Sequence, residues 1–268
     1  MAQVDSGLST GISELDRLLR GLIPGDNVVW QVDNMEQYLP FVRPYYKNAL
    51  ASGKSVIYFR FGQHEQLVPD SSGVEICKLD PGQGFEPFLS AIRGKIEQAG
   101  RGAFYVFDCV SDLSHYFNSD SMVGNFFMLT CPYLYNLETI AYFALLRNQH
   151  SFHATTPIRQ TTQLFLDVRS YQGEIYVHPQ KVQQRYSPTM YMMHVWRGGQ
   201  FLPVSESYII ARILTSGVQS ALDAAGTRLG PWTRTFIRAE EILEEIKRGI
   251  SPPEKGQEIF QKMLSMSI

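Results

Sequence analysis

Short apolar runs alternate with amphipathic stretches along most of the chain. Polar or turn-forming residues bound each run, which is typical of a buried strand. The stretches between the runs repeat their apolar residues at the spacing of an α-helix. The pattern predicts strands over residues 28–32, 55–61, 74–79, 103–108 and 139–146, and helices over residues 12–19, 36–52, 84–99 and 121–137, the last interrupted at Pro132.

After residue 160 the strand-like segments follow one another directly. We predict strands over 161–168, 174–177 and 190–195, with turns at Gln172-Gly173 and Arg197-Gly198-Gly199. Alternating strands and helices favour a parallel sheet, whereas a cluster of successive strands favours antiparallel pairing. The predicted fold class is therefore α/β: a mostly parallel sheet with helices on both faces, an antiparallel C-terminal strand extension and a helical tail.

The chain changes character near residue 225. An amphipathic helix is predicted over 205–224, and the segment 226–232 carries the Gly, Pro and Trp residues of a boundary. We expect one domain over 1–225 and a helical linker or docking tail over 226–268. The tail contains two short apolar stripes, Ile242, Leu243 and Ile246, then Ile259, Phe260 and Met263. Such short helices are unstable alone, so we expect them to pack on the body, on a second copy, or on a C-terminal domain of a longer chain.

Composition narrows the classes of partner. Net charge is -2, which gives no electrostatic reason to expect nucleic acid as a partner. The chain lacks both the apolar run of about 18 residues that a membrane span needs and the basic-then-apolar start of a signal peptide. Its three cysteines, Cys77, Cys109 and Cys131, are far apart, so neither a zinc site nor a disulfide framework is expected. We therefore expect no membrane partner and a cytoplasmic location.

One motif near the start of the chain is specific. Residues 9–19 read S-T-G-I-S-E-L-D-R-L-L and continue through G-L-I-P-G-D to an apolar strand. This segment resembles the entry of the KaiC/RadA branch of the RecA-fold P-loop ATPases. In that family a G-x-x-x-x-G-K-[ST] loop follows the strand, but here residues 32–40 read V-D-N-M-E-Q-Y-L-P. The next features arrive without a change of length, so the loop is substituted and not deleted.

The substituted loop lacks the groups that bind phosphate. A P-loop presents backbone N–H groups, a Lys and a hydroxyl that holds Mg²⁺. In ungapped register Tyr38 replaces the Lys and Leu39 replaces the hydroxyl residue, while Asp33 and Glu36 add negative charge. The only G-K-S triplet in the sequence begins at Gly53, lacks the first glycine of the motif and precedes a strand. The resemblance therefore implies a kept fold and lost chemistry.

Two further positions bear on catalysis. Phe104 to Asp108 resembles the Walker B strand, whose Asp orients Mg²⁺ in the family; an Asp at a strand end also caps turns, and both interpretations stay open. The family's second strand ends F-E-E, where a Glu activates water. Here Phe61 is followed by Gly62 and Gln63, so no carboxylate stands there, although Glu65 or His64 could rescue the function from a shifted loop.

Residues 181–188 resemble the K-x-R-G-S segment, whose basic side chains reach a nucleotide across a subunit interface in the family. Lys181 matches, but Gln183 stands where the Arg is expected, and Arg185 follows two positions later. The resemblance covers about residues 7–204 and predicts that strands 28–32 and 104–108 are parallel neighbours; a sheet in which they are not would argue against it. The nucleotide-site remnants are Asp108, Lys181, Arg185, Tyr38 and Gln63, with no catalytic and no metal residue.

Two other constellations carry less weight. His150 and His153 have the spacing of a metal pair on a helix, but a solvated loop is the favoured interpretation. Ser111, Asp112 and His115 contain the residue types of a hydrolase triad, but no strained nucleophile turn accompanies them.

Two functions follow from these patterns. The first is a non-catalytic RecA/KaiC-like pseudo-ATPase module with an assembly or regulatory role and no cofactor. The tail resembles the lead-in to the nucleotide-grasping part of phosphoenolpyruvate synthase or pyruvate phosphate dikinase-like chains, so this module would be the front of a larger protein, which could itself be a phosphotransferase. The alternative is a nucleotide-binding enzyme or sensor that uses ATP and Mg²⁺ through a rewired site of Asp108, Lys181, Arg185 and residues 31–38.

Overall fold

A computed structural model describes residues 8–117 and 119–225, together with residues 242, 246, 252 and 254–258; for residues 217–225 only the backbone is described. The chain divides into two compact units, Met1–Ile213 and Leu214–Ile268, and the first unit holds the sheet. The expected tail over 226–268 lies almost wholly outside the described residues.

The strands are β1 (Asn27–Val32), β2 (Val56–Arg60), β3 (Glu75–Lys78), β4 (Phe104–Cys109), β5 (Ile140–Leu146), β6 (Leu164–Tyr171), β7 (Glu174–Val182), β8 (His194–Arg197) and β9 (Gln200–Pro203). The α-helices are α1 (Ser13–Leu19), α2 (Met35–Ala51), α3 (Phe85–Ala99), α4 (Leu113–Phe117), α5 (Ser121–Asn136), α6 (Phe152–Thr161) and α7 (Ser207–Ala225). The described residues also form the 3-10 turns η1 (Asp70–Ser72), η2 (Pro81–Gln83) and η3 (Val110–Asp112).

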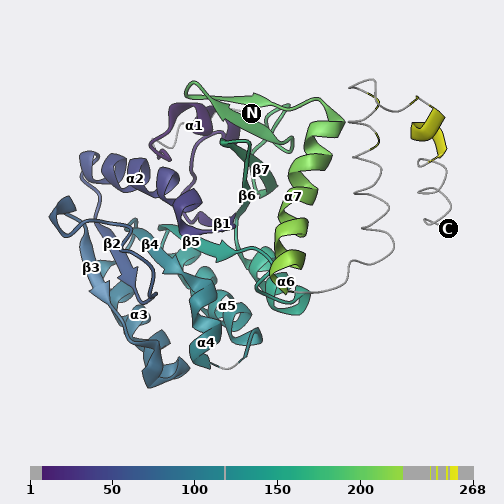
Figure 1. Ribbon diagram of the computed structural model, residues 1–268. Helices are drawn as coiled ribbons and strands as arrows, with labels where there is room; N and C mark the ends of the chain where they lie inside the picture. The colour runs from purple at the N-terminus through teal and green to yellow at the C-terminus, as the bar shows by residue number, and fades with distance from the viewer. Residues whose placement is uncertain are drawn as a thin grey trace. The chain divides into compact units, whose positions relative to one another are not determined.

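The nine strands of the described residues form one mixed sheet in the order β3-β2-β4-β5-β1-β6-β7-β8-β9. Figure 1 labels the strands from β3 to β7. The pairs from β3 to β6 are parallel. The pairs from β6 to β9 are antiparallel. The predicted fold class, a mostly parallel α/β sheet with an antiparallel extension, is confirmed.

The predicted adjacency of strands 28–32 and 104–108 is wrong. These strands are β1 and β4, and β5 lies between them, pairing with both. The chain leaves β4, passes through α5 and returns as the next strand over, which follows the tendency of consecutive strands to be neighbours. β1 and β4 are nevertheless parallel, and their carboxyl ends lie at the same edge of the sheet.

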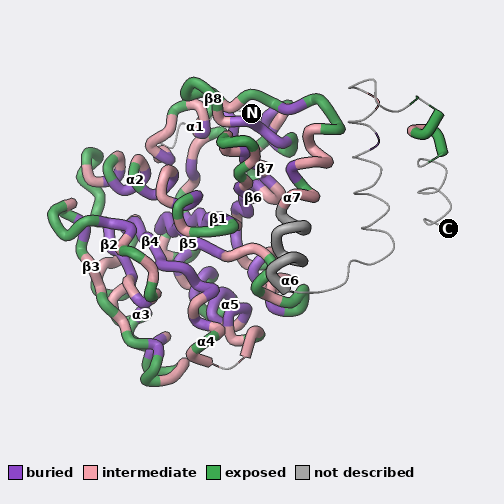
Figure 2. Tube along the Cα trace, in the orientation of Figure 1, coloured by how far each residue is buried: buried purple, intermediate pink, exposed green. Residues whose placement is uncertain are grey.

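Helices cover both faces of the parallel half (Figure 1). On one face, α1 and α2 pack over one set of strand side chains and enclose the first core cluster. On the other face, α3, α4, α5 and α6 pack over the alternate set and enclose the second. Successive strand residues point to opposite faces, so strands covered on both sides are buried along most of their length, as Figure 2 shows. The buried residues of these strands are almost all apolar.

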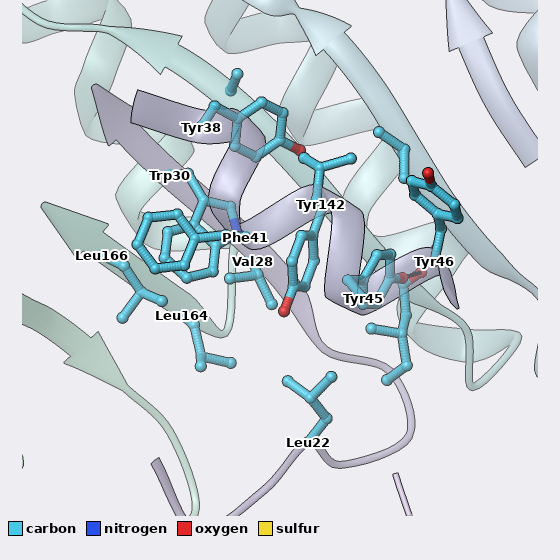
Figure 3. Close-up of a cluster of buried hydrophobic side chains, with 14 of the residues drawn as sticks. Leu22, Val28, Trp30, Tyr38, Phe41, Tyr45, Tyr46, Tyr142, Leu164 and Leu166 are labelled. Atoms are coloured by element: carbon cyan, nitrogen blue, oxygen red, sulfur yellow. Dashed lines mark hydrogen bonds between the residues drawn. The ribbon is translucent and has the colours of Figure 1, made fainter. Parts of the chain in front are cut away.

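The core beneath α2 is rich in aromatic rings (Figure 3). The ring of Trp30 stacks on Phe41 with centroids 4.2 Å apart, and Tyr45 stacks on Tyr142 at 3.8 Å. These four side chains are almost fully buried. They fix α2 against β1 and β5, and therefore fix the strand-to-helix turn that replaces the phosphate loop.

The entry motif has a structural explanation in this chain. The Asp16 carboxylate accepts hydrogen bonds from the Ser9 hydroxyl at 2.5 Å and the Thr10 backbone N–H at 2.8 Å. Between them Gly11 has φ 79°, a left-handed conformation that glycine adopts without penalty. The S-T-G…D pattern thus closes a loop onto the first turns of α1 and needs no nucleotide to do so.

Several predicted elements differ from the structure. Helix α5 runs through Pro132 without a break. Pro132 has no N–H to donate to the Met128 carbonyl, but both residues lie on the exposed face of the helix, where water can hydrate that carbonyl. Residues 152–161 form α6, which the pattern missed, and the strand predicted from residue 161 begins at Leu164. The strand predicted over 190–195 is β8, which begins only at His194.

Candidate functional site

The carboxyl ends of the parallel strands form the edge where an α/β sheet usually binds ligands. The chain leaves β1 into α2 on one face and leaves β5 towards α6 on the opposite face. In open α/β sheets, ligands usually bind beside neighbouring strands whose connections diverge in this way. Residues 33–39 and residues 147–151 therefore stand at the place where a phosphate loop is expected.

A side-chain cap, not a glycine loop, makes the turn between β1 and α2. The side-chain oxygen of Asn34, the N-cap residue of α2, accepts a hydrogen bond from the Gln37 N–H at 3.1 Å. The side-chain oxygen of Gln37 in turn accepts from the Asp33 N–H at 2.8 Å. This reciprocal arrangement resembles a capping box, and it uses backbone donors that a phosphate loop would offer to its ligand.

A buried ion-pair network closes the same turn from the β5 side. Arg147 Nε donates to Asp33 Oδ1 at 2.7 Å, another of its nitrogens pairs with Asp167, and a third donates to the Val168 carbonyl at 2.5 Å. Only 7% of the Arg147 side chain is exposed. Burial alone would lower the pKa of Arg147, but Asp167 and Asp33 outweigh it and raise the pKa. The guanidinium therefore stays charged and joins β1, β5 and β6.

Tyr38, which stands at the position of the phosphate-binding Lys, points into the protein core. Its side chain is fully buried (Figure 3), and its hydroxyl has no hydrogen-bond partner among the described residues. Burial raises the pKa of the phenol well above its ordinary value. Tyr38 can therefore offer neither a charge nor a solvent-facing donor to a phosphate.

Asp108, the remnant of the Walker B strand, is fully buried and held by protein groups. Oδ2 accepts hydrogen bonds from Arg60 Nη1 at 2.7 Å, the Phe61 N–H at 2.8 Å and the Gly62 N–H at 2.7 Å. Oδ1 accepts from the Tyr58 hydroxyl. In this arrangement Asp108 fixes the chain that follows β2, and a metal ion would have to displace Arg60 to reach it.

The loop after β2 carries the remaining carboxyl-edge candidate. Gln63 is exposed, and its Nε2 donates to the Tyr116 hydroxyl at 3.3 Å. The neighbouring Gly62 occupies a position where a Cβ would lie 2.6 Å from Asp112 Oδ2. A family-like Glu at residue 62 would therefore overlap a carboxylate of this chain.

Lys181 and Arg185 lie at the opposite, amino end of the parallel strands. Lys181 Nζ donates to the carbonyls of Arg159 at 2.5 Å and Thr162, at the end of α6. Arg185 donates to both carboxylate oxygens of Asp26, at 2.6 and 2.8 Å, just before β1. The structure thus places Asp108, Tyr38 and Gln63 towards one end of the sheet and the two basic residues at the other, where intrachain partners hold them.

One arrangement at the carboxyl edge was missed by the sequence patterns. His150 Nε2 lies 2.7 Å from Ser111 Oγ, and His150 Nδ1 lies 2.5 Å from Asp120 Oδ1. The ionised Asp120 can only accept, so Nδ1 carries a proton and the ring is oriented as in a Ser-His-Asp triad. The solvated-loop interpretation is wrong for His150, whose side chain is 1% exposed, while His153 is exposed.

Access decides what this arrangement can do. Ser111 is fully buried, and its Oγ also accepts the Leu146 N–H at 2.8 Å. A nucleophile must reach a substrate carbonyl, and this oxygen is enclosed by protein. Ser111, His150 and Asp120 therefore tie the ends of β4 and β5 to the start of α5. The two other members of the trio discussed from sequence, Asp112 and His115, are not the partners of Ser111 in these contacts.

The donor set at this edge of the sheet does not fit ATP with Mg²⁺. The turn into α2 lacks a glycine loop and a Lys, and Asp108 is bound to Arg60. Among the described residues, no group of three His, Cys, Asp or Glu side chains lies close enough to hold a metal ion. Within the same residues, no helix is long and apolar enough to span a membrane.

No protein-family model and no curated protein matches this chain in sequence.

Proposed function

We propose that this chain is a non-catalytic RecA/KaiC-like module that serves assembly or regulation. The observation that carries the proposal is the turn from β1 to α2, where Asn34 and Gln37 cap the helix and Asp33 is bound to Arg147. Phosphoryl transfer depends on positioning and charge stabilisation, and this turn supplies neither a phosphate cradle nor a Lys. The resemblance to the RecA/KaiC family rests on the motif over residues 9–26. The insertion of β5 between β1 and β4 argues against it, because the resemblance predicted that these two strands are neighbours.

Nucleotide binding tests the proposal directly. The 268-residue chain should show no ATP hydrolysis above background and no thermal stabilisation by ATP, with or without Mg²⁺. A ligand present at 100 times its dissociation constant would stabilise the fold by roughly 2.7 kcal/mol, so binding of useful affinity would be visible. Turnover that disappears in Asp108→Asn would contradict the proposal and favour the rewired-site alternative.

The assembly role has its own support in an exposed face of α5. Met128, Leu129 and Tyr135 are 44%, 55% and 41% exposed, and clustered apolar exposure often marks an interaction surface. We propose that a second copy covers this face, in a cytoplasmic protein that is the front of a larger, phosphoenolpyruvate synthase-like chain.

Light scattering of Leu129→Glu tests self-association, with Gln98→Glu on the exposed face of α3 as the matched control. A monomer for the unaltered chain would contradict self-association.

A further inference from the structure

Arg147 lies between two carboxylates of different exposure. Among the ion pairs of the described residues, Arg147 contacts Asp33 and Asp167, and Asp167 also contacts Arg169 Nε at 3.0 Å. Asp167 is fully buried, while the Asp33 side chain is 39% exposed. Arg147 therefore pairs with one enclosed carboxylate and with one carboxylate that reaches the surface.

Asp33 also stands beside the amino end of α2, where the helix dipole favours negative charge. Gln37 Nε2 donates to its Oδ2 at 3.1 Å and to Ser170 Oγ at 3.1 Å. The carboxylate is thus held by a cation on one side and an amide donor on the other. These are the contacts that an external oxyanion would require at the same point.

We propose that Asp33 is a built-in anion that occupies this position, and that phosphate groups are excluded because a carboxylate of the chain already pairs with Arg147. The inference rests on the proposed function and deepens it, since it names the contact that excludes the ligand. It predicts that removal of one carboxylate, without any added cation, opens a site for a small oxyanion of the phosphate class.

Geometry supports solvent access to the vacated position. Asp33 reaches the surface, so truncation at Cβ would expose Arg147 Nε to solvent while Asp167 and the Val168 carbonyl still hold the other two nitrogens. Arg147 would keep its place and gain one unpaired, charged donor. A buried cation that loses one of its two carboxylate partners destabilises the fold, and binding of an anion would offset this loss.

Pyrophosphate is the probe, and thermal unfolding at constant ionic strength is the readout. In Asp33→Ala the melting temperature should rise saturably with pyrophosphate, while the unaltered chain should show no saturable rise. The double variant Asp33→Ala, Arg147→Met should bind pyrophosphate about ten- to a hundred-fold more weakly than Asp33→Ala, the range for a hydrogen bond to a charged group. The rise in melting temperature should therefore disappear at the concentrations that saturate Asp33→Ala. Asp70→Ala, an exposed carboxylate in η1, controls for the change of net charge and should not respond.

The outcomes separate the two ideas. If Asp33→Ala is folded by circular dichroism but gains no response, or if the response survives the loss of Arg147, the inference is overturned while the proposed function stands. If Asp33→Ala does not fold, Asp33→Ser takes its place, since it also removes the carboxylate and keeps a polar side chain at the turn. Saturable binding of pyrophosphate by the unaltered chain overturns the inference; binding of ATP with Mg²⁺ by that chain overturns the proposed function.

Discussion

A Cβ on Gly11 would stand 2.2 Å from the carbonyl oxygen of Pro44. The loop of the entry motif therefore lies directly against the backbone of α2, and the glycine is required by this approach as well as by its φ of 79°. No side-chain movement relieves the overlap, because the atom in the way belongs to the backbone.

Gly11→Ala should consequently destabilise the fold by about 3 kcal/mol or more, the sum of a left-handed alanine and a displaced backbone. Gly53→Ala is the matched control, because Gly53 has φ 69° and a methyl group there would have no other atom within 4 Å. It should cost only about 1–2 kcal/mol. Urea unfolding of both variants measures the difference, and equal losses would show that the contact with Pro44 is unimportant.

Asp108 should prove to be a structural residue. Asp108→Asn leaves Arg60 without its carboxylate, and breaking a buried ion pair costs about 3–5 kcal/mol. We expect the lower end, because 18% of the Arg60 side chain is exposed. In a double-mutant cycle, Arg60→Met with Asp108→Asn should cost less than the sum of the single changes. Strict additivity in urea unfolding would mean that the two groups do not interact.

Acid should weaken the contact between Asp120 and the β5–α6 loop. Burial opposes ionisation of Asp120, but hydrogen bonds from Ser151 and His150 outweigh it and hold the pKa below the ordinary 3.8. A lowered carboxyl pKa stabilises the fold above the unfolded value, and this effect is lost as pH falls through the folded value. The difference in urea midpoint between Asp120→Asn and the unaltered chain should shrink below about pH 4. A difference that stays constant down to the acid limit of folding would contradict this.

Thiol reactivity should distinguish the three cysteines. Burial raises the pKa of Cys109 to about 12 and also raises that of the fully buried Cys131. Cys77 is only half-buried, although burial raises its pKa as well. Because the thiolate is the reactive form, a thiol-specific reagent should modify only Cys77 in the folded protein, slowly, and all three cysteines in denaturant. Cys77→Ser should abolish labelling of the folded form, and rapid labelling of Cys109 would show that β4 opens.

The apolar pattern predicted most of the sheet, because strands covered on both faces must be apolar along their whole length. It failed at α6, where the internal Pro157 hides a helix that Ser151 caps and that buries Ala154 and Ile158. Those two signals, a cap and a four-residue apolar spacing, could have revealed it. The same segment begins next to His150, so the missed helix and the misjudged histidine have one cause.

The site was harder to predict, because long-range pairing decides its contacts. The replacement of the phosphate loop was visible in the residues, and the burial of Tyr38 fits that replacement. The pairing of Arg147 with Asp33 spans 114 positions, and that of His150 with Ser111 spans 39. No local pattern predicts such pairs, since they depend on β5 being inserted between β1 and β4.

The mixed pairing of β6 has a consequence for the order in which the sheet assembles. On one side β6 pairs with β7 through a short turn, as Arg169 faces Tyr176, and such hairpins form in about 1–10 μs. On the other side it meets β1, whose second neighbour is β5, as Val28 faces Tyr142. Pairs so distant in sequence form slowly. In pulsed hydrogen exchange during refolding, amides of the β6–β9 meander should gain protection before those of β1, which completes the sheet last.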